Sequence, residues 1–109
     1  MQCPDPVEFI EAFWVEPVED PAGGWTVVLQ GPEGEHRLAI RVWPDRGEVG
    51  WTRWVGVAPV DRTHIRGVRR LYFSEEGRLF GEAAGGVSFF IDKDPLPSVK
   101  LTILGSAVG

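Results

Sequence analysis

Arginine and tryptophan share one face of two strand-like stretches of the sequence, and these residue types often dominate the energy of binding. Arg37, Arg41 and Trp43 lie in register with one another, two or four positions apart. Trp54 lies in the next stretch, opposite Trp51. If each stretch has one solvent-facing side, that side carries a predicted binding site made of Arg37, Arg41, Trp43 and Trp54. The alternative is that a second layer of the protein buries these tryptophans.

Residues suited to catalysis or metal binding are few. His36 and His64 are the only histidines, and the single cysteine, Cys3, is distant in sequence. Asp61 precedes His64 by three positions, but residues 58–63 have the composition of a loop rather than of a helix. None of the four serines lies in a nucleophile-elbow context. We therefore predict no metal and no cofactor, and we treat an enzyme with a site around His36 or His64 as the least favoured hypothesis.

Charge is distributed unevenly along the chain. Residues 1–35 carry eight acids and no lysine or arginine, whereas residues 36–78 carry nine arginines and five acids. The formal net charge of −5 argues against general nucleic-acid binding, which depends on neutralising phosphates. The acids could pair with the arginines across a sheet, or they could form a patch that attracts a basic partner.

Turn signals divide the chain at regular intervals. Residues 31–34, 44–47 and 74–77 each end in glycine, as in a type I turn closed by a residue at positive φ. Gly85 and Gly86 are suited to a two-residue hairpin loop.

Alternation of apolar and polar residues predicts strands between these turns. It is clearest over residues 25–30, 37–42, 87–92 and 98–103, and weaker over residues 49–57 and 66–73. Arg53 interrupts an otherwise apolar face, which indicates either a bulge or a paired arginine.

The first segment supports two interpretations. Asp5, Pro6 and Glu8 resemble the start of a helix over residues 6–14, on which Ile10, Phe13 and Trp14 would share a face. The aromatic and β-branched content of residues 9–16 slightly favours a strand instead.

These elements predict one domain over residues 1–109 with a mainly β fold. We expect an antiparallel meander of seven or eight short strands, curled into a half-barrel or sandwich. The alternative is an α+β fold with one short N-terminal helix. One cysteine cannot form an intramolecular disulfide, no secretory signal is visible, and the longest apolar runs are too short to span a bilayer. The simplest expectation is a cytoplasmic protein that does not bind membranes.

We predict a non-enzymatic interaction protein, such as an inhibitor, an immunity-type protein or a small adaptor. It would bind another macromolecule through a sheet face or an acidic patch. The runner-up is a β-domain that binds a small ligand or carbohydrate between aromatic side chains and arginines. A homodimer is compatible with each hypothesis, because the edge strands of an antiparallel sheet can pair.

Overall fold

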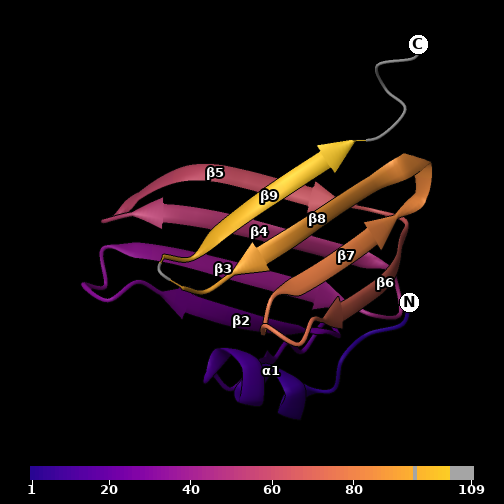
Figure 1. Ribbon diagram of the computed structural model, residues 1–109, viewed down its shortest axis with the longest axis horizontal. Helices are drawn as coiled ribbons and strands as arrows, with labels where there is room; N and C mark the ends of the chain where they lie inside the picture. The colour runs from indigo at the N-terminus through magenta and orange to yellow at the C-terminus, as the bar shows by residue number, and fades with distance from the viewer. Residues whose placement is uncertain (95, 104–109) are drawn as a thin grey trace.

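Two antiparallel sheets form the two layers of the computed structural model, which describes residues 1–94 and 96–103 (Figure 1). The first sheet is a meander of five strands in chain order: β1 (Val18–Glu19), β2 (Trp25–Gln30), β3 (His36–Trp43), β4 (Glu48–Val55) and β5 (Ala58–Ile65). The second is a meander of four: β6 (Val68–Phe73), β7 (Leu79–Ala83), β8 (Val87–Asp92) and β9 (Ser98–Ile103). The predicted mainly β fold of antiparallel strands is therefore confirmed as a sandwich, but the described residues form nine strands in two meanders, whereas one meander of seven or eight strands was predicted.

The N-terminal segment is a helix, α1 (Pro6–Phe13), so the slightly favoured strand interpretation of residues 9–16 is wrong. Pro6 opens the helix, and the Glu8 carboxylate accepts a hydrogen bond from the Asp5 backbone N–H at 2.7 Å. Phe9 and Phe13, four positions apart, are fully buried. The predicted face of Ile10, Phe13 and Trp14 is also wrong, because Ile10 and Trp14 are exposed.

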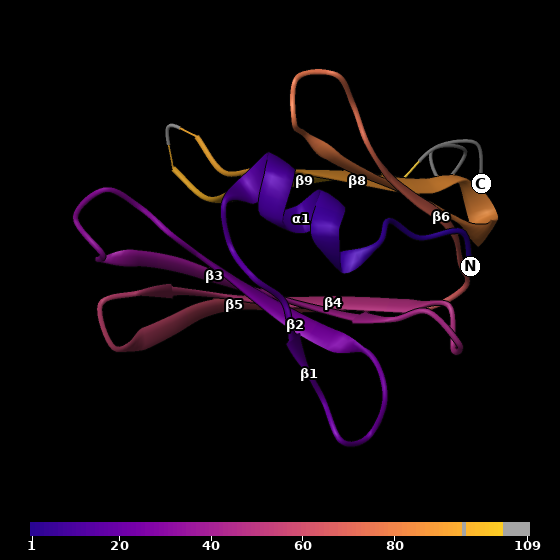
Figure 2. The ribbon, with the colours of Figure 1, turned by 90° about the horizontal axis from the view of Figure 1, so that it is seen from below.

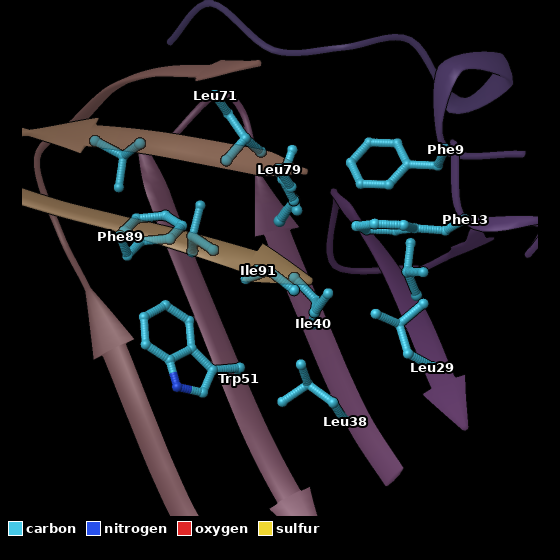
Figure 3. Close-up of a cluster of buried hydrophobic side chains, with 14 residues drawn as sticks. Phe9, Phe13, Leu29, Leu38, Ile40, Trp51, Leu71, Leu79, Phe89 and Ile91 are labelled. Carbon is cyan, nitrogen blue, oxygen red and sulfur yellow. The ribbon is translucent and has the colours of Figure 1, made fainter. Parts of the chain in front are cut away.

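Helix α1 closes one side of the sandwich, between the two layers (Figure 2). The rings of Phe9 and Phe13 point into the core (Figure 3). Both meet Phe73 in edge-to-face geometry, at centroid distances of 5.0 and 5.1 Å. Elsewhere in the core, Trp51 of β4 and Phe89 of β8 join the two sheets at 5.1 Å. The core thus depends on the helix as well as on both sheets.

The three predicted turns that end in a glycine at positive φ are confirmed. Gly34, Gly47 and Gly77 all have positive φ, and each donates its backbone N–H to the carbonyl three residues earlier. The loop at Gly85 and Gly86 differs from the prediction, because a short 3₁₀ turn over Ala84–Gly86 makes a three-residue connection between paired residues Ala83 and Val87.

Strand β5 was missed by the prediction of a loop at residues 58–63. The strand is mostly exposed at the edge of its sheet, so it lacks the apolar alternation that marks a half-buried strand. Pro59 is tolerated there because an edge strand leaves one side of its backbone unpaired. The bulge suggested by Arg53 is confirmed as a shift of register between Arg53 and Trp54 in the β4–β5 pairing.

The first residues cover the outer edge of β6. Gln2 donates its backbone N–H to Arg69 at 3.1 Å and accepts a hydrogen bond from Leu71 at 2.8 Å. This isolated parallel pairing hides part of an edge that would otherwise be available to another strand. Among the described helical residues, none forms a helix long and apolar enough to cross a membrane.

Candidate binding site on the five-stranded sheet

A hollow of about 350 Å³ lies on the outer face of the five-stranded sheet. This face is turned away from the four-stranded sheet and from α1, which both lie on the other side (Figure 2). We call it the Trp–Arg hollow, and its walls are formed by five large side chains: Arg41, Trp43, Trp54, Arg62 and His64. Its remaining lining is contributed mainly by small residues, including Ala39, Gly50 and Thr52.

Strand register explains how these residues meet. Ala39 on β3, Thr52 on β4 and Arg62 on β5 form one row across the sheet. The next row contains Arg41, Gly50 and His64 in the same order. Because side chains two positions apart share a face, both rows point away from the core. The small residues of β4 and β3 therefore leave a depression between the longer side chains.

Trp43 and His64 form one end of the hollow. Their rings lie 5.4 Å apart at an interplanar angle of 34°, and His64 Nε2 is 2.6 Å from Oε1 of Glu48. Gly50 lies beneath them, and a Cβ at this position would be 3.4 Å from His64 Nδ1 and 3.7 Å from Trp43 Cζ3. A larger side chain at Gly50 would therefore occupy the space that the two rings and the hollow use.

Trp54 forms the opposite end, and Arg37 supports it from outside. The Arg37 guanidinium carbon lies 5.4 Å from the centre of the Trp54 ring, within the range of a cation–π contact. The same guanidinium donates a 3.5 Å hydrogen bond to the Gly56 carbonyl. Arg37 is thus held by its own neighbours and does not line the hollow.

Three of the four predicted site residues, Arg41, Trp43 and Trp54, line one hollow, and Arg37 lies beside it. Both tryptophans are half-buried by neighbouring side chains of their own sheet face, and the second buried layer considered above does not cover them in the described part of the chain. Their role in binding remains a prediction.

Sequence reasoning missed Arg62 and His64, because it assigned a loop to most of β5. The alternation that could have revealed them is short: Arg62 and His64 face outward, whereas Thr63 and Ile65 are partly buried on the other face. A strand prediction over these positions would have placed a further arginine and a histidine beside Trp43.

The hollow is locally electropositive on an acidic protein. Arg41 and Arg62 are exposed, and neither forms an ion pair within residues 1–94 and 96–103. Glu48, on the same strand as Gly50 and Thr52, is already engaged by His64. Two guanidinium groups are therefore available at this site to an anionic group from outside the chain.

The acids of residues 1–35 do not form the predicted ion pairs with the arginine-rich middle. The two ion pairs in the described ranges join Glu48 to His64 and Asp92 to Arg78. The reason is placement, because the early acids occur on α1, on β1 and in turns rather than on the strand beside β3. Four glutamates instead gather around a second depression between α1 and the β6–β7 turn: Glu8, Glu11, Glu75 and Glu76.

The outer face of the four-stranded sheet carries a row of three aromatic rings, which was not predicted from the sequence. Tyr72 and Phe80 stack at 5.6 Å, and Phe80 meets Phe90 at 5.7 Å. Guanidinium groups cover the two ends, with Arg70 4.2 Å from the Tyr72 ring and Arg78 4.4 Å from the Phe90 ring. Because these contacts already use the ring faces, the Trp–Arg hollow is the stronger candidate for a binding site.

Groups for covalent or metal chemistry are not assembled at the hollow. Burial raises the pKa of the Cys3 thiol to about 12, so it is protonated and a poor nucleophile near neutral pH. No group of three His, Cys, Asp or Glu side chains within the described residues could hold a metal ion. His36 and His64 lie apart, because His36 has the register of the core-facing residues of β3 and lines a different depression, whereas His64 lines the hollow. The carboxylate beside His64 leaves the enzyme hypothesis open.

Comparison with known proteins identifies a shared fold rather than a family. No family model matches the sequence, and no curated protein matches it. The structure is similar to a chain of the contact-dependent growth inhibition toxin–immunity protein complex from Klebsiella pneumoniae 342, with a TM-score of 0.79. The similarity covers 93% of this chain and 95% of that chain, at 15% sequence identity.

Proposed function

We propose that this protein is a non-enzymatic inhibitor of the immunity type, which binds a protein toxin through the outer face of its five-stranded sheet. The observation that carries the proposal is the fold similarity over nearly the whole length of both chains to a member of a toxin–immunity protein complex. A further support is the solvent-facing Trp–Arg hollow, since tryptophan and arginine are enriched at the energetic centres of protein interfaces.

The structurally similar complex contains both a toxin and an immunity protein, and we favour the role of the immunity protein for this chain. An inhibitor works by surface complementarity, and the hollow offers aromatic walls and charged groups suited to that purpose. The net charge of −5 would draw a basic toxin toward the molecule over a long range. We place this activity in the cytoplasm, where a protein with one cysteine needs no disulfide.

The proposal is tested with the product of the adjacent gene in the native host. Co-expression should protect cells from growth arrest by that product, and calorimetry should show binding by the purified pair. Trp43→Ala and Trp54→Ala should each weaken binding about tenfold or more, as expected for residues at the centre of an interface. Protection should fall in parallel.

Two controls locate the interface. Trp14→Ala removes an exposed tryptophan far from the sheet face, and the double variant Glu75→Lys and Glu76→Lys reverses charge at the acidic depression. We expect both to retain binding within a few-fold of the wild type. Loss of binding in the glutamate variant alone would instead place the partner on the acidic depression, and an adjacent-gene product that does not bind would contradict the inhibitor proposal.

A small-ligand-binding domain is the second candidate, because the hollow volume of about 350 Å³ lies within the range of ligand sites. A panel of sugars and organic anions would test it through tryptophan fluorescence. A saturable response lost in both Trp43→Phe and Trp54→Phe, with no toxin binding, would favour this candidate over the first.

A further inference from the structure

We propose that the Trp–Arg hollow is a socket for an acidic side chain, aspartate or glutamate, presented by the protein partner. This inference rests on the proposed function, which supplies a protein partner, and it adds the chemistry by which that partner is recognised. Four features of the hollow support it: two available arginines, an internal acid that is already engaged, small residues at the base, and an aromatic rim.

The two arginines approach the hollow from opposite sides. Arg41 is on β3 and Arg62 is on β5, and both flank the small residues of β4. Within the part of the chain that the structure describes, neither forms an ion pair. Guanidinium groups bind carboxylates through parallel N–H···O hydrogen bonds, so one carboxylate between them would satisfy several donors at once.

An acid at the end of the hollow, Glu48, is engaged by a histidine. Oε1 of Glu48 lies 2.6 Å from Nε2 of His64, and the Trp43 ring lies 5.4 Å from the same imidazole ring. This arrangement keeps the Glu48 carboxylate at the end of the hollow rather than at its centre. The positive charge of Arg41 and Arg62 is therefore not neutralised from within.

The shape of the hollow lets a side chain reach the arginines. Ala39 and Gly50 leave space above the sheet, and Thr52 adds a hydroxyl group that can donate a hydrogen bond. Trp43 and Trp54 at the two ends would exclude water once a partner covers the rim, and a charged pair is stronger where water is excluded. The short aliphatic stem of an aspartate or glutamate, ending in a carboxylate, fits this combination of aromatic ends, arginine side walls and a base of small residues.

A phosphate group is also an anion that guanidinium groups bind, but the net charge of the protein disfavours it. The net charge of −5 repels a polyanion, whereas a single acidic residue on a basic partner avoids that cost. Inorganic phosphate therefore serves as the competing probe in the experiment.

The experiment uses the full chain and a capped glutamate, acetyl-Glu-amide, with acetyl-Gln-amide as the neutral control. Indole N–H signals in ¹H–¹⁵N spectra report on each tryptophan separately. We expect saturable shifts of the Trp43 and Trp54 signals with capped glutamate in the millimolar range, with the exposed Trp14 signal unchanged. Arg41→Gln and Arg62→Gln should each weaken the response about tenfold, whereas Arg69→Gln on the other sheet should not.

Three outcomes would overturn the socket: equal shifts with capped glutamine, undiminished binding in both hollow variants, or tighter binding of phosphate than of capped glutamate. None of these concerns the toxin, so failure of the socket is separate from failure of the inhibitor proposal. Once the toxin is identified, Arg41→Glu should abolish its binding. Replacing the toxin acid that enters the hollow by arginine should restore binding to this variant. Full binding by Arg41→Glu would also overturn the socket.

Discussion

Trp14 has a backbone conformation that is energetically unfavourable for any residue other than glycine. It ends α1 with φ of 60°, in the left-handed region that favours glycine, and its side chain is 82% exposed. Its backbone N–H donates to Ile10 at 2.9 Å, so the helix end needs this conformation but not this side chain. A non-glycine residue in such a position costs about 1 kcal/mol or more.

Trp14→Gly should therefore stabilise the protein by about 1 kcal/mol, because glycine adopts positive φ without steric cost. Chemical denaturation followed by circular dichroism would measure the change. Trp14→Ala is the matched control, since it removes the same ring but keeps the strained backbone, and it should show no such gain. A less stable glycine variant would mean that the indole ring contributes to the fold.

The thiol of Cys3 provides a pH-dependent prediction. Burial raises its pKa from 9.0 to about 12, so the folded state holds the proton more tightly than the unfolded state does. The associated stability is fully present below pH 9 and is lost as the pH rises toward 12. Reaction with a thiol reagent should be slow near neutral pH and faster after unfolding. Cys3→Ala should lack this part of the alkaline loss, and a fast-reacting folded thiol would contradict the assignment.

Sequence alternation was sufficient to find Arg41 and Trp43 on β3 and Trp54 on β4, because the other faces of these two strands are mainly apolar. It was insufficient for Arg62 and His64, whose edge strand buries little on either face. Position on the face also did not distinguish Arg37 from Arg41. Only the three-dimensional contacts show that Arg37 is occupied by Trp54 and Gly56, whereas Arg41 is available.

At the scale of elements, α1 shows why local propensity was misleading. Aromatic residues favour strands on average. Phe9 and Phe13, however, are spaced by one helical turn, and both meet Phe73 of β6 in the four-stranded sheet. The start signal at Asp5, Pro6 and Glu8 agreed with the helix, whereas the composition of the following residues did not. Tertiary packing settled this conflict, and it was not visible in the local sequence.

The pairing of β7 with β8 depends on a glycine. Gly81 is opposite Phe89, and a Cβ at Gly81 would lie 2.1 Å from Cζ of the Phe89 ring. The ring therefore lies across the glycine and reaches Trp51 in the other sheet. Neither the turns nor the alternation pattern predicts this contact between neighbouring strands.

Gly81→Ala should destabilise the protein by about 1–3 kcal/mol, because the added methyl group must displace a core ring. Gly31→Ala is a matched control at another glycine without positive φ, where the closest atom belongs to the flexible end of Leu96 at 3.1 Å. We expect a smaller loss there. Thermal denaturation of both variants would measure the difference, and equal stabilities would contradict this account.

At the scale of the whole molecule, the sheet edges differ in their protection. Strand β5 carries Pro59 and charged residues, and the segment at Gln2 covers part of β6. Strand β9 includes Leu101, whose side chain is 41% exposed. The homodimer suggested by the sequence would therefore form most readily through β9.

Size-exclusion chromatography with light scattering tests this prediction. A dimer formed through β9 should dissociate in Leu101→Lys, because paired strands would bring two like charges together. Lys100→Gln, which changes charge on the same strand without adding any at Leu101, is the control. A dimer that survives Leu101→Lys would place the interface elsewhere, and a monomer at all concentrations would retire the homodimer prediction.

The packing of α1 against Phe73 also determines when the hydrophobic core can be completed during synthesis of the chain. Phe9 and Phe13 leave the ribosome early, but the aromatic ring that covers them follows about sixty residues later, which takes roughly 3–12 s at ordinary translation rates. During that interval the helix can pack against Trp25 of β2 but lacks Phe73, whereas the five-stranded meander can already form from local hairpins. Under the inhibitor proposal, the sheet face would thus form before the packing of the N-terminal helix is complete, and protection would begin on a partly assembled chain.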